Sequence, residues 1–132
     1  IRALKDGVID CIASDHAPHH QDDKFMEYDL AAFGMTGLQL TVPLLLAQIE
    51  QGVLTWEEFV RITAENPAKI LKLHDRGRIA RNMKADITVI DPSHSYVFDE
   101  TVNKSLSKNT PYWGKPLKGK TAVVIKNGRR LI

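Results

Sequence analysis

The sequence of 132 residues contains almost no cysteine and no long hydrophobic run. Cys11 is the only cysteine, which excludes a disulfide framework and a cysteine-based zinc site within the chain, and we interpret it as a small buried side chain. No segment approaches the roughly 18 consecutive apolar residues that a membrane span needs, so we expect no membrane partner. A single cysteine fits a reducing compartment, and we expect a cytoplasmic protein.

An excess of charge of one sign is also missing. Lysine and arginine number 18 against 16 aspartates and glutamates, which gives a net charge of +2. Charges of both signs are mixed along the chain, whereas a nucleic-acid interface needs a basic patch or stripe. We therefore expect no nucleic-acid partner, and we interpret the basic residues near the C-terminus as a solvated face.

The beginning of the sequence has neither an initiator methionine nor a signal-peptide pattern. Residues 1–7 are typical of the last turn of a helix that Gly7 closes. We therefore expect this chain to be a fragment, with further sequence upstream of Ile1.

The first part of the chain has the pattern of an α/β protein. Val8–Ser14 is an apolar run that predicts a strand buried on both faces, as in a parallel sheet. Residues 15–37 predict a long polar loop, and loops of this length are usually functional or disordered. Helices are predicted over residues 38–51, 55–63 and 66–73, the second with the capping box Thr55–Glu58 and the third with Asn66 as its N-cap.

The second part has the pattern of a small β unit. Strands are predicted over residues 85–90, 96–98 and 121–125, and Asn127–Gly128 predicts a hairpin turn into the last residues. We therefore divide the chain into residues 1–75, with the last strand, an active-site loop and the C-terminal helices of a barrel, and residues 76–132, part of a small β domain.

One carboxylate and three imidazoles follow the apolar run within six residues: Asp15, His16, His19 and His20. α/β enzymes place catalytic groups where a rigid strand ends and a loop facing the ligand begins. A structural Asp–His pair is the alternative, but the number of such groups here favours a metal or catalytic site. The spacing matches neither His-x-His nor His-Glu-x-x-His, so the chain shows no complete zinc site.

Ser14–His19, with the sequence Ser-Asp-His-Ala-Pro-His, resembles the last barrel-strand motif of class I dihydroorotases, which are cyclic amidases of the amidohydrolase superfamily. Further similarities span nearly the whole chain, although Gln39 stands where an acid is frequent and Ala32–Phe33 replaces a common proline-containing pair. These similarities lie at Gly34–Gln39, Asn66–Leu71, Gly77–Ala80, Ala85–Asp91 and Asn109–Gly114.

The resemblance implies the C-terminal end of a metal-dependent-hydrolase (β/α)8 barrel followed by part of a β-sandwich. It implies that Asp15 is a zinc ligand and the general base, which takes a proton from the attacking water and passes it to the leaving nitrogen. It implies that His19 binds the substrate carboxylate, and that Phe33 and Gly34 contact the substrate ring through backbone groups. The remaining ligands of one or two zinc ions would lie upstream of Ile1, so the isolated chain should be inactive.

The reaction that the resemblance implies is the reversible interconversion of N-carbamoyl-L-aspartate and dihydroorotate in pyrimidine biosynthesis. The alternatives are another cyclic amidase, such as an allantoinase or dihydropyrimidinase, and a non-catalytic dihydroorotase-like subunit that scaffolds aspartate transcarbamoylase. Asp15 and His19 argue against the second alternative. Besides a small-molecule substrate, we expect a homo-oligomer, with aspartate transcarbamoylase as a candidate partner.

Overall fold

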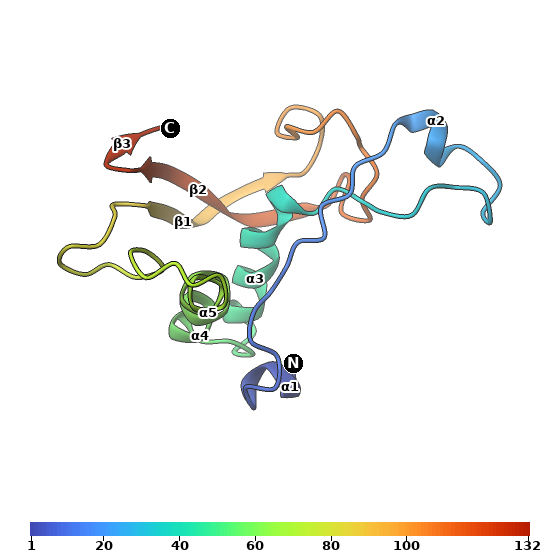
Figure 1. The fold of residues 1–132 in the computed structure, drawn as a ribbon. Coiled ribbons are helices and arrows are strands. Elements are labelled where there is room, and N and C mark those ends of the chain that lie inside the picture. Colours follow the sequence, from blue (N-terminus) through green and yellow to red (C-terminus); the bar gives the residue numbers. More distant parts are fainter.

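A computed structural model describes residues 1–132 as a group of helices beside a three-stranded antiparallel sheet, with two long loops that extend to one side (Figure 1). No helix combines the length and the apolar character that crossing a bilayer requires. The helical elements are α1 (Arg2–Lys5), α2 (Gln21–Lys24), η1 (Leu38–Leu40), α3 (Thr41–Glu50), α4 (Trp56–Val60), η2 (Arg61–Glu65) and α5 (Asn66–Ile70). The strands are β1 (Ile87–Val97), β2 (Pro116–Lys126) and β3 (Arg129–Arg130).

The capping box predicted at the start of α4 is confirmed. Thr55 Oγ1 accepts from the Glu58 N–H at 3.2 Å, and the Thr55 N–H donates to Glu58 Oε2 at 2.8 Å. Two of the orphan N–H groups at this helix start are thereby satisfied. The start of α4 thus depends on residues within one turn of each other, which is why the sequence alone predicts it.

The prediction that Asn66 caps a new helix is wrong. α4 continues through the π-helical turn η2 into α5, and Glu65 and Asn66 are both helical. A wide turn changes the register of the hydrogen bonds, so Pro67, which has no N–H to donate, fits without ending the helix. The Asn66 side chain instead donates to the Asp10 carbonyl at 2.7 Å. The helix ends at Ile70, short of the predicted residue 73.

Val8–Ser14 is extended but forms no strand, which corrects the sequence prediction. A strand requires a neighbouring strand, and no other segment of residues 1–132 forms a ladder with this one. Its apolar side chains are correspondingly open to solvent, with Val8 75% and Ile9 48% exposed. Two hydrogen bonds tie residues 10–12 to the helices: the Ile12 N–H donates to the Ile62 carbonyl at 3.2 Å, and Asn66 Nδ2 donates to the Asp10 carbonyl at 2.7 Å.

The predicted strands at 85–90 and 96–98 form one strand, β1, instead of two. β1 pairs with β2, and the register shifts between Asp91 and Ser95. Pro92 cannot donate to the ladder, and the Asp91 carboxylate accepts from the Ser93 N–H at 2.9 Å, so the irregular stretch forms a bulge and the strand continues. The hairpin at Asn127–Gly128 is confirmed, with both residues at positive φ.

The hydrophobic core lies among the helices and the edge of the sheet. The β2 strand packs against α3, and Ile90 of β1 contacts the helical core. The division at residue 75 remains a prediction. The core cluster consists of Leu4, Leu45, Leu54, Phe59 and Ile62.

Candidate functional site

Asp15 ends the extended segment in an unusual backbone conformation. Its φ is +43°, in the left-handed region that few residues other than glycine adopt, although aspartate and asparagine tolerate it. Strained backbone is concentrated at functional sites. The Asp15 side chain is exposed and takes part in none of the ion pairs of the chain. The carboxylate is therefore free to bind a ligand or to accept a proton.

The residues after Asp15 run beside residues 33–36. His16 and Met35 form a parallel bridge, and the Ala17 N–H donates to the Met35 carbonyl at 3.0 Å. His19 Nε2 lies 2.7 Å from the Phe33 carbonyl, so this nitrogen carries the proton of the hydrogen bond. Three of the predicted site residues, His19, Phe33 and Gly34, are thereby brought together; their roles remain predictions.

Gly34 occupies a position that no other residue fits. Its φ is +128°, and a Cβ built on it would lie 2.7 Å from both the Cβ and the carbonyl oxygen of Ala17 and 3.2 Å from His19 Nε2. Both the conformation and the lack of space require glycine here. The close approach of the two segments therefore depends on this residue.

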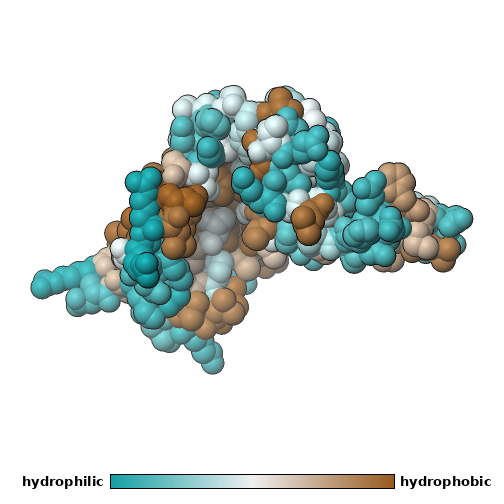
Figure 2. Space-filling model, turned by 90° about the horizontal axis from the view of Figure 1, so that it is seen from above, coloured by the Kyte–Doolittle hydropathy of each residue, from teal (hydrophilic) through white to brown (hydrophobic).

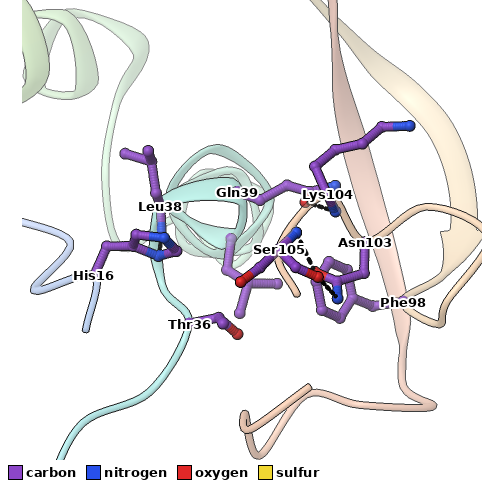
Figure 3. Close-up of a pocket in the computed structure, with 9 residues that line it drawn as sticks. His16, Thr36, Leu38, Gln39, Phe98, Asn103, Lys104 and Ser105 are labelled. Carbon is purple, nitrogen blue, oxygen red and sulfur yellow. Dashed lines mark hydrogen bonds between the residues drawn. The ribbon is translucent and has the colours of Figure 1, made fainter. Parts of the chain in front are cut away.

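The other two histidines of the cluster have structural roles. His16 Nδ1 accepts from the N–H groups of Gly37 and Leu38 at 3.1 and 3.2 Å, and so caps the start of η1 (Figure 3). His20 Nδ1 accepts from the Asp22 N–H at 3.3 Å and caps α2. Both rings use Nδ1 as an acceptor, which places the proton of the neutral ring on Nε2.

A cleft of about 880 Å³ opens beside His19, between residues 18–25 and residues 105–109. Lys24 contributes positive charge to its lining, and no carboxylate lines it; Lys108 also lines the cleft but is paired with Glu100 at 2.8 Å. The cleft therefore suits an anionic ligand better than a cationic one.

Lys24 and Asn109 contact the Gly34 carbonyl, and sequence reasoning missed both contacts. Lys24 Nζ donates to it at 3.1 Å and Asn109 Nδ2 at 2.8 Å. Asn109 belongs to a motif that the sequence analysis noted without assigning it a role, whereas nothing in the sequence distinguishes Lys24 from other lysines.

A second hollow, of about 320 Å³, lies between η1 and the loop over residues 99–107, where Gln39 and Lys104 lie close together (Figure 3). Gln39 Nε2 donates to the Val102 carbonyl at 2.6 Å, and Gln39 Oε1 accepts from the Lys104 N–H at 3.0 Å. A side-chain amide supplies both a donor and an acceptor, whereas a carboxylate supplies acceptors alone. Glutamine at this position therefore fastens the 99–109 loop to η1.

The substitution Gln39→Glu should loosen this loop. A carboxylate cannot donate to the Val102 carbonyl, and one lost exposed hydrogen bond costs about 0.5–1.5 kcal/mol. Hydrogen exchange in a peptide covering residues 102–109 should therefore become faster. Gln51→Glu is the matched control, since Gln51 is exposed and its side chain makes no hydrogen bond. Equal exchange rates in the two variants would contradict the role of Gln39.

Residues 1–132 do not build a complete metal centre. No group of three or more histidine, cysteine, aspartate or glutamate side chains is placed to hold a metal ion. A catalytic zinc site needs three protein ligands, and Asp15 can supply one oxygen donor. A zinc site that included Asp15 would therefore need further donors from outside these residues.

The sequence profile of the amidohydrolase family matches residues 1–131. A dihydroorotase of Pelobacter propionicus is 47% identical over 130 residues, and one of Geobacter metallireducens is 47% identical over 127 residues. The matches cover 98% and 96% of this chain but 30% of each relative, so the chain spans about a third of the length of these proteins.

Solved structures match the same share of this chain and also cover it as part of a longer protein. The L-hydantoinase (dihydropyrimidinase) from Arthrobacter aurescens matches with a TM-score of 0.88 at 28% identity, over 98% of this chain and 30% of that protein. The dihydropyrimidinase from Brevibacillus agri matches with a TM-score of 0.90 at 23% identity, over 98% of this chain and 30% of that protein, which shows the fold alone. These matches confirm the fold class predicted from the sequence.

Proposed function

Because this chain belongs to the amidohydrolase family, we propose that it carries part of the active site of a cyclic amide hydrolase. The proposed reaction is the interconversion of N-carbamoyl-L-aspartate and dihydroorotate in pyrimidine biosynthesis. The observation that carries the proposal is the contact of His19 with the Phe33–Gly34 turn, four residues after Asp15, whose carboxylate is exposed. Because the chain spans about 30% of its relatives, the activity belongs to the whole protein.

Asp15 is the proposed general base. Its exposed carboxylate accepts the proton of the water that attacks the ring amide and returns it to the leaving nitrogen. A carboxylate in this role must be within hydrogen-bond reach of both atoms. No other group of the chain pairs with this side chain, which supports its availability for such contacts.

Asp15 is also the proposed metal ligand from this chain, with zinc as the proposed ion. When bound, such an ion polarises the amide carbonyl and makes water more acidic. Asp15 fits as one oxygen donor, and the other ligands come from the rest of the protein. Within this chain, the chemistry that remains is proton transfer and substrate binding.

His19 is the proposed binding group for the substrate carboxylate. Its Nε2–H is already used by the Phe33 carbonyl, so Nδ1 is the nitrogen that faces a ligand. An imidazole that donates from both nitrogens carries a positive charge, and a charge-assisted hydrogen bond to carboxylate is stronger than a neutral one.

A dihydropyrimidinase is the second candidate, favoured by the structural match to the enzyme of Arthrobacter aurescens. Dihydrouracil, a dihydropyrimidine, lacks the carboxylate that distinguishes dihydroorotate. A role for His19 in carboxylate binding therefore favours dihydroorotate as the substrate. The proposed roles of Asp15 and His19 argue against a non-catalytic scaffold, since a scaffolding subunit would need neither side chain.

Steady-state assays of the full-length protein on dihydroorotate, dihydrouracil and allantoin test the proposal. We expect kcat/KM to be highest for dihydroorotate. Faster hydrolysis of dihydrouracil or allantoin would contradict dihydroorotate as the substrate. No turnover of any of the three, with metal bound, would favour the non-catalytic scaffold.

A further inference from the structure

The turn at Ala32–Gly34 is held by side chains from outside the turn. Each of its three carbonyl groups accepts a side-chain hydrogen bond. Ala32 accepts from Lys24 Nζ at 2.5 Å, and Phe33 accepts from His19 Nε2 at 2.7 Å. Gly34 accepts from both Lys24 Nζ at 3.1 Å and Asn109 Nδ2 at 2.8 Å.

The N–H groups of Phe33 and Gly34, in contrast, donate no hydrogen bond within the chain. The turn therefore has its three acceptors occupied and the donors of Phe33 and Gly34 free, whereas the Ala32 N–H donates to the Asp23 carbonyl at 2.9 Å. The Phe33 N–H lies in the same peptide plane as the Ala32 carbonyl, and the Gly34 N–H lies in the same plane as the Phe33 carbonyl. The plane after Gly34 depends on the backbone angles of Gly34, and glycine adopts many such angles with little difference in energy. Bonds to the Gly34 carbonyl select one of them.

Local structure places Lys24 where it can bind the carbonyls of the turn. It is the last residue of α2, a single helical turn that His20 caps. Its side chain is half-buried, lines the cleft beside His19 and is paired with no carboxylate. Two of the three donors of its ammonium group are used by the turn.

Asn109 reaches the same carbonyl from 75 residues further along the chain. Its own backbone is fixed, because its carbonyl accepts from the Thr36 N–H at 3.0 Å and its N–H donates to Ser107 Oγ at 3.3 Å. The loop over residues 99–109 is in turn fastened to η1 by Gln39. Asn109 thus connects the turn to the loop over residues 99–109.

We infer that Lys24 and Asn109 are positioning residues: by holding the Ala32 and Gly34 carbonyls, they fix the peptide planes before Phe33 and after Gly34, and so the direction in which the Phe33 and Gly34 N–H groups face the substrate. This inference rests on the proposed function, in which that turn contacts the substrate ring. Neither residue needs to touch the substrate. Their loss should weaken substrate binding more than it slows the chemical step.

The test uses the full-length protein with Lys24→Met, Asn109→Ala and the double variant. Each single variant should raise KM for dihydroorotate roughly fivefold, as expected for one lost hydrogen bond, with a smaller change in kcat. The double variant should raise KM by more than the product of the two, because each residue partly compensates for the other. Hydrogen exchange in a peptide covering residues 30–36 should become faster in each single variant and fastest in the double variant.

Two control variants separate positioning from general destabilisation. Lys5→Met removes an exposed lysine that makes no side-chain hydrogen bond, and it should leave KM and exchange unchanged. Asn103→Ala removes bonds to the Ser105 and Ser107 carbonyls, which loosens the 99–109 loop without removing a bond to Gly34. It should raise KM by less than half as much as Asn109→Ala does.

Unchanged KM and unchanged exchange in the double variant would overturn the inference. So would an equal rise of KM in Asn103→Ala and Asn109→Ala. If the wild-type protein hydrolysed no cyclic amide, the proposed function would fail instead. The exchange measurement would then still decide whether Lys24 and Asn109 hold the turn.

Discussion

Asp15→Asn in the full-length protein should lower kcat by roughly 10²–10⁴-fold, the usual contribution of a general base. The amide has the shape of the carboxylate but cannot take up the proton of the attacking water. Asparagine also tolerates the left-handed conformation at φ +43°, so the backbone should keep its place. The loss of activity should therefore reflect the missing base and metal ligand, with no contribution from altered folding.

Asp10→Asn is the matched control for this variant. Asp10 is exposed and lies five residues earlier on the same segment, and the carbonyl that Asn66 binds is a backbone group that the substitution leaves in place. The control should keep kcat within about twofold of wild type, as expected for an exposed side chain outside the site. A kcat for Asp15→Asn within tenfold of wild type would contradict the proposed role of Asp15.

Gly34→Ala should lower kcat/KM by roughly 100-fold or more, because a displacement of about 1 Å at a reacting site has effects of this size. Alanine is strained at φ +128°, and its Cβ would lie 2.7 Å from two atoms of Ala17. The turn must therefore move away from residues 17–19. Its N–H groups would then no longer face the substrate in the same direction.

Gly7→Ala provides the comparison for Gly34→Ala. Gly7 also has a positive φ, +73°, but a Cβ there meets nothing within 4 Å. It should cost about 1–2 kcal/mol of stability, the usual penalty for the left-handed conformation, and leave kcat/KM unchanged. Near wild-type kcat/KM in Gly34→Ala would show that the close approach to Ala17 is not needed for activity.

Features that depend on neighbours in sequence were predicted correctly. The capping box at Thr55 and the hairpin at Asn127–Gly128 involve residues at most three positions apart, so the residue types decide the local structure. The fold class was also predicted, because the motifs that carry it are short and contiguous. The roles of Asp15 and His19 came from resemblance, and the geometry adds the contacts around them.

Features that depend on distant partners were missed. Val8–Ser14 has the composition of a buried strand, but a strand forms only where another strand lies beside it. The contacts of Gly34 with Lys24 and Asn109 join residues 10 and 75 positions apart, and no local pattern indicates them. The continuous helix through Asn66 likewise depends on a π-helical turn that removes the need for a cap.

The exposed apolar side chains of the loop over residues 15–37 were likewise not predicted from the sequence. Phe25, Tyr28 and Phe33 are 78%, 94% and 88% exposed, and apolar side chains are visible at the far end of the molecule (Figure 2). Their sequence gives no periodic pattern that would predict what they contact. Phe33 is one of these exposed residues and also belongs to the proposed substrate-binding turn. There the backbone of Phe33, and not its side chain, is proposed to contact the substrate ring.

Zinc content, measured side by side for Asp15→Asn and His19→Ala in the full-length protein, tests the assignment of the two residues most directly. We predict that Asp15→Asn loses metal together with kcat. His19→Ala should keep the wild-type metal content and show a raised KM for dihydroorotate, because only a binding group for the carboxylate is removed. Loss of zinc in His19→Ala alone, with full metal content in Asp15→Asn, would contradict the assignment and make His19 the ligand.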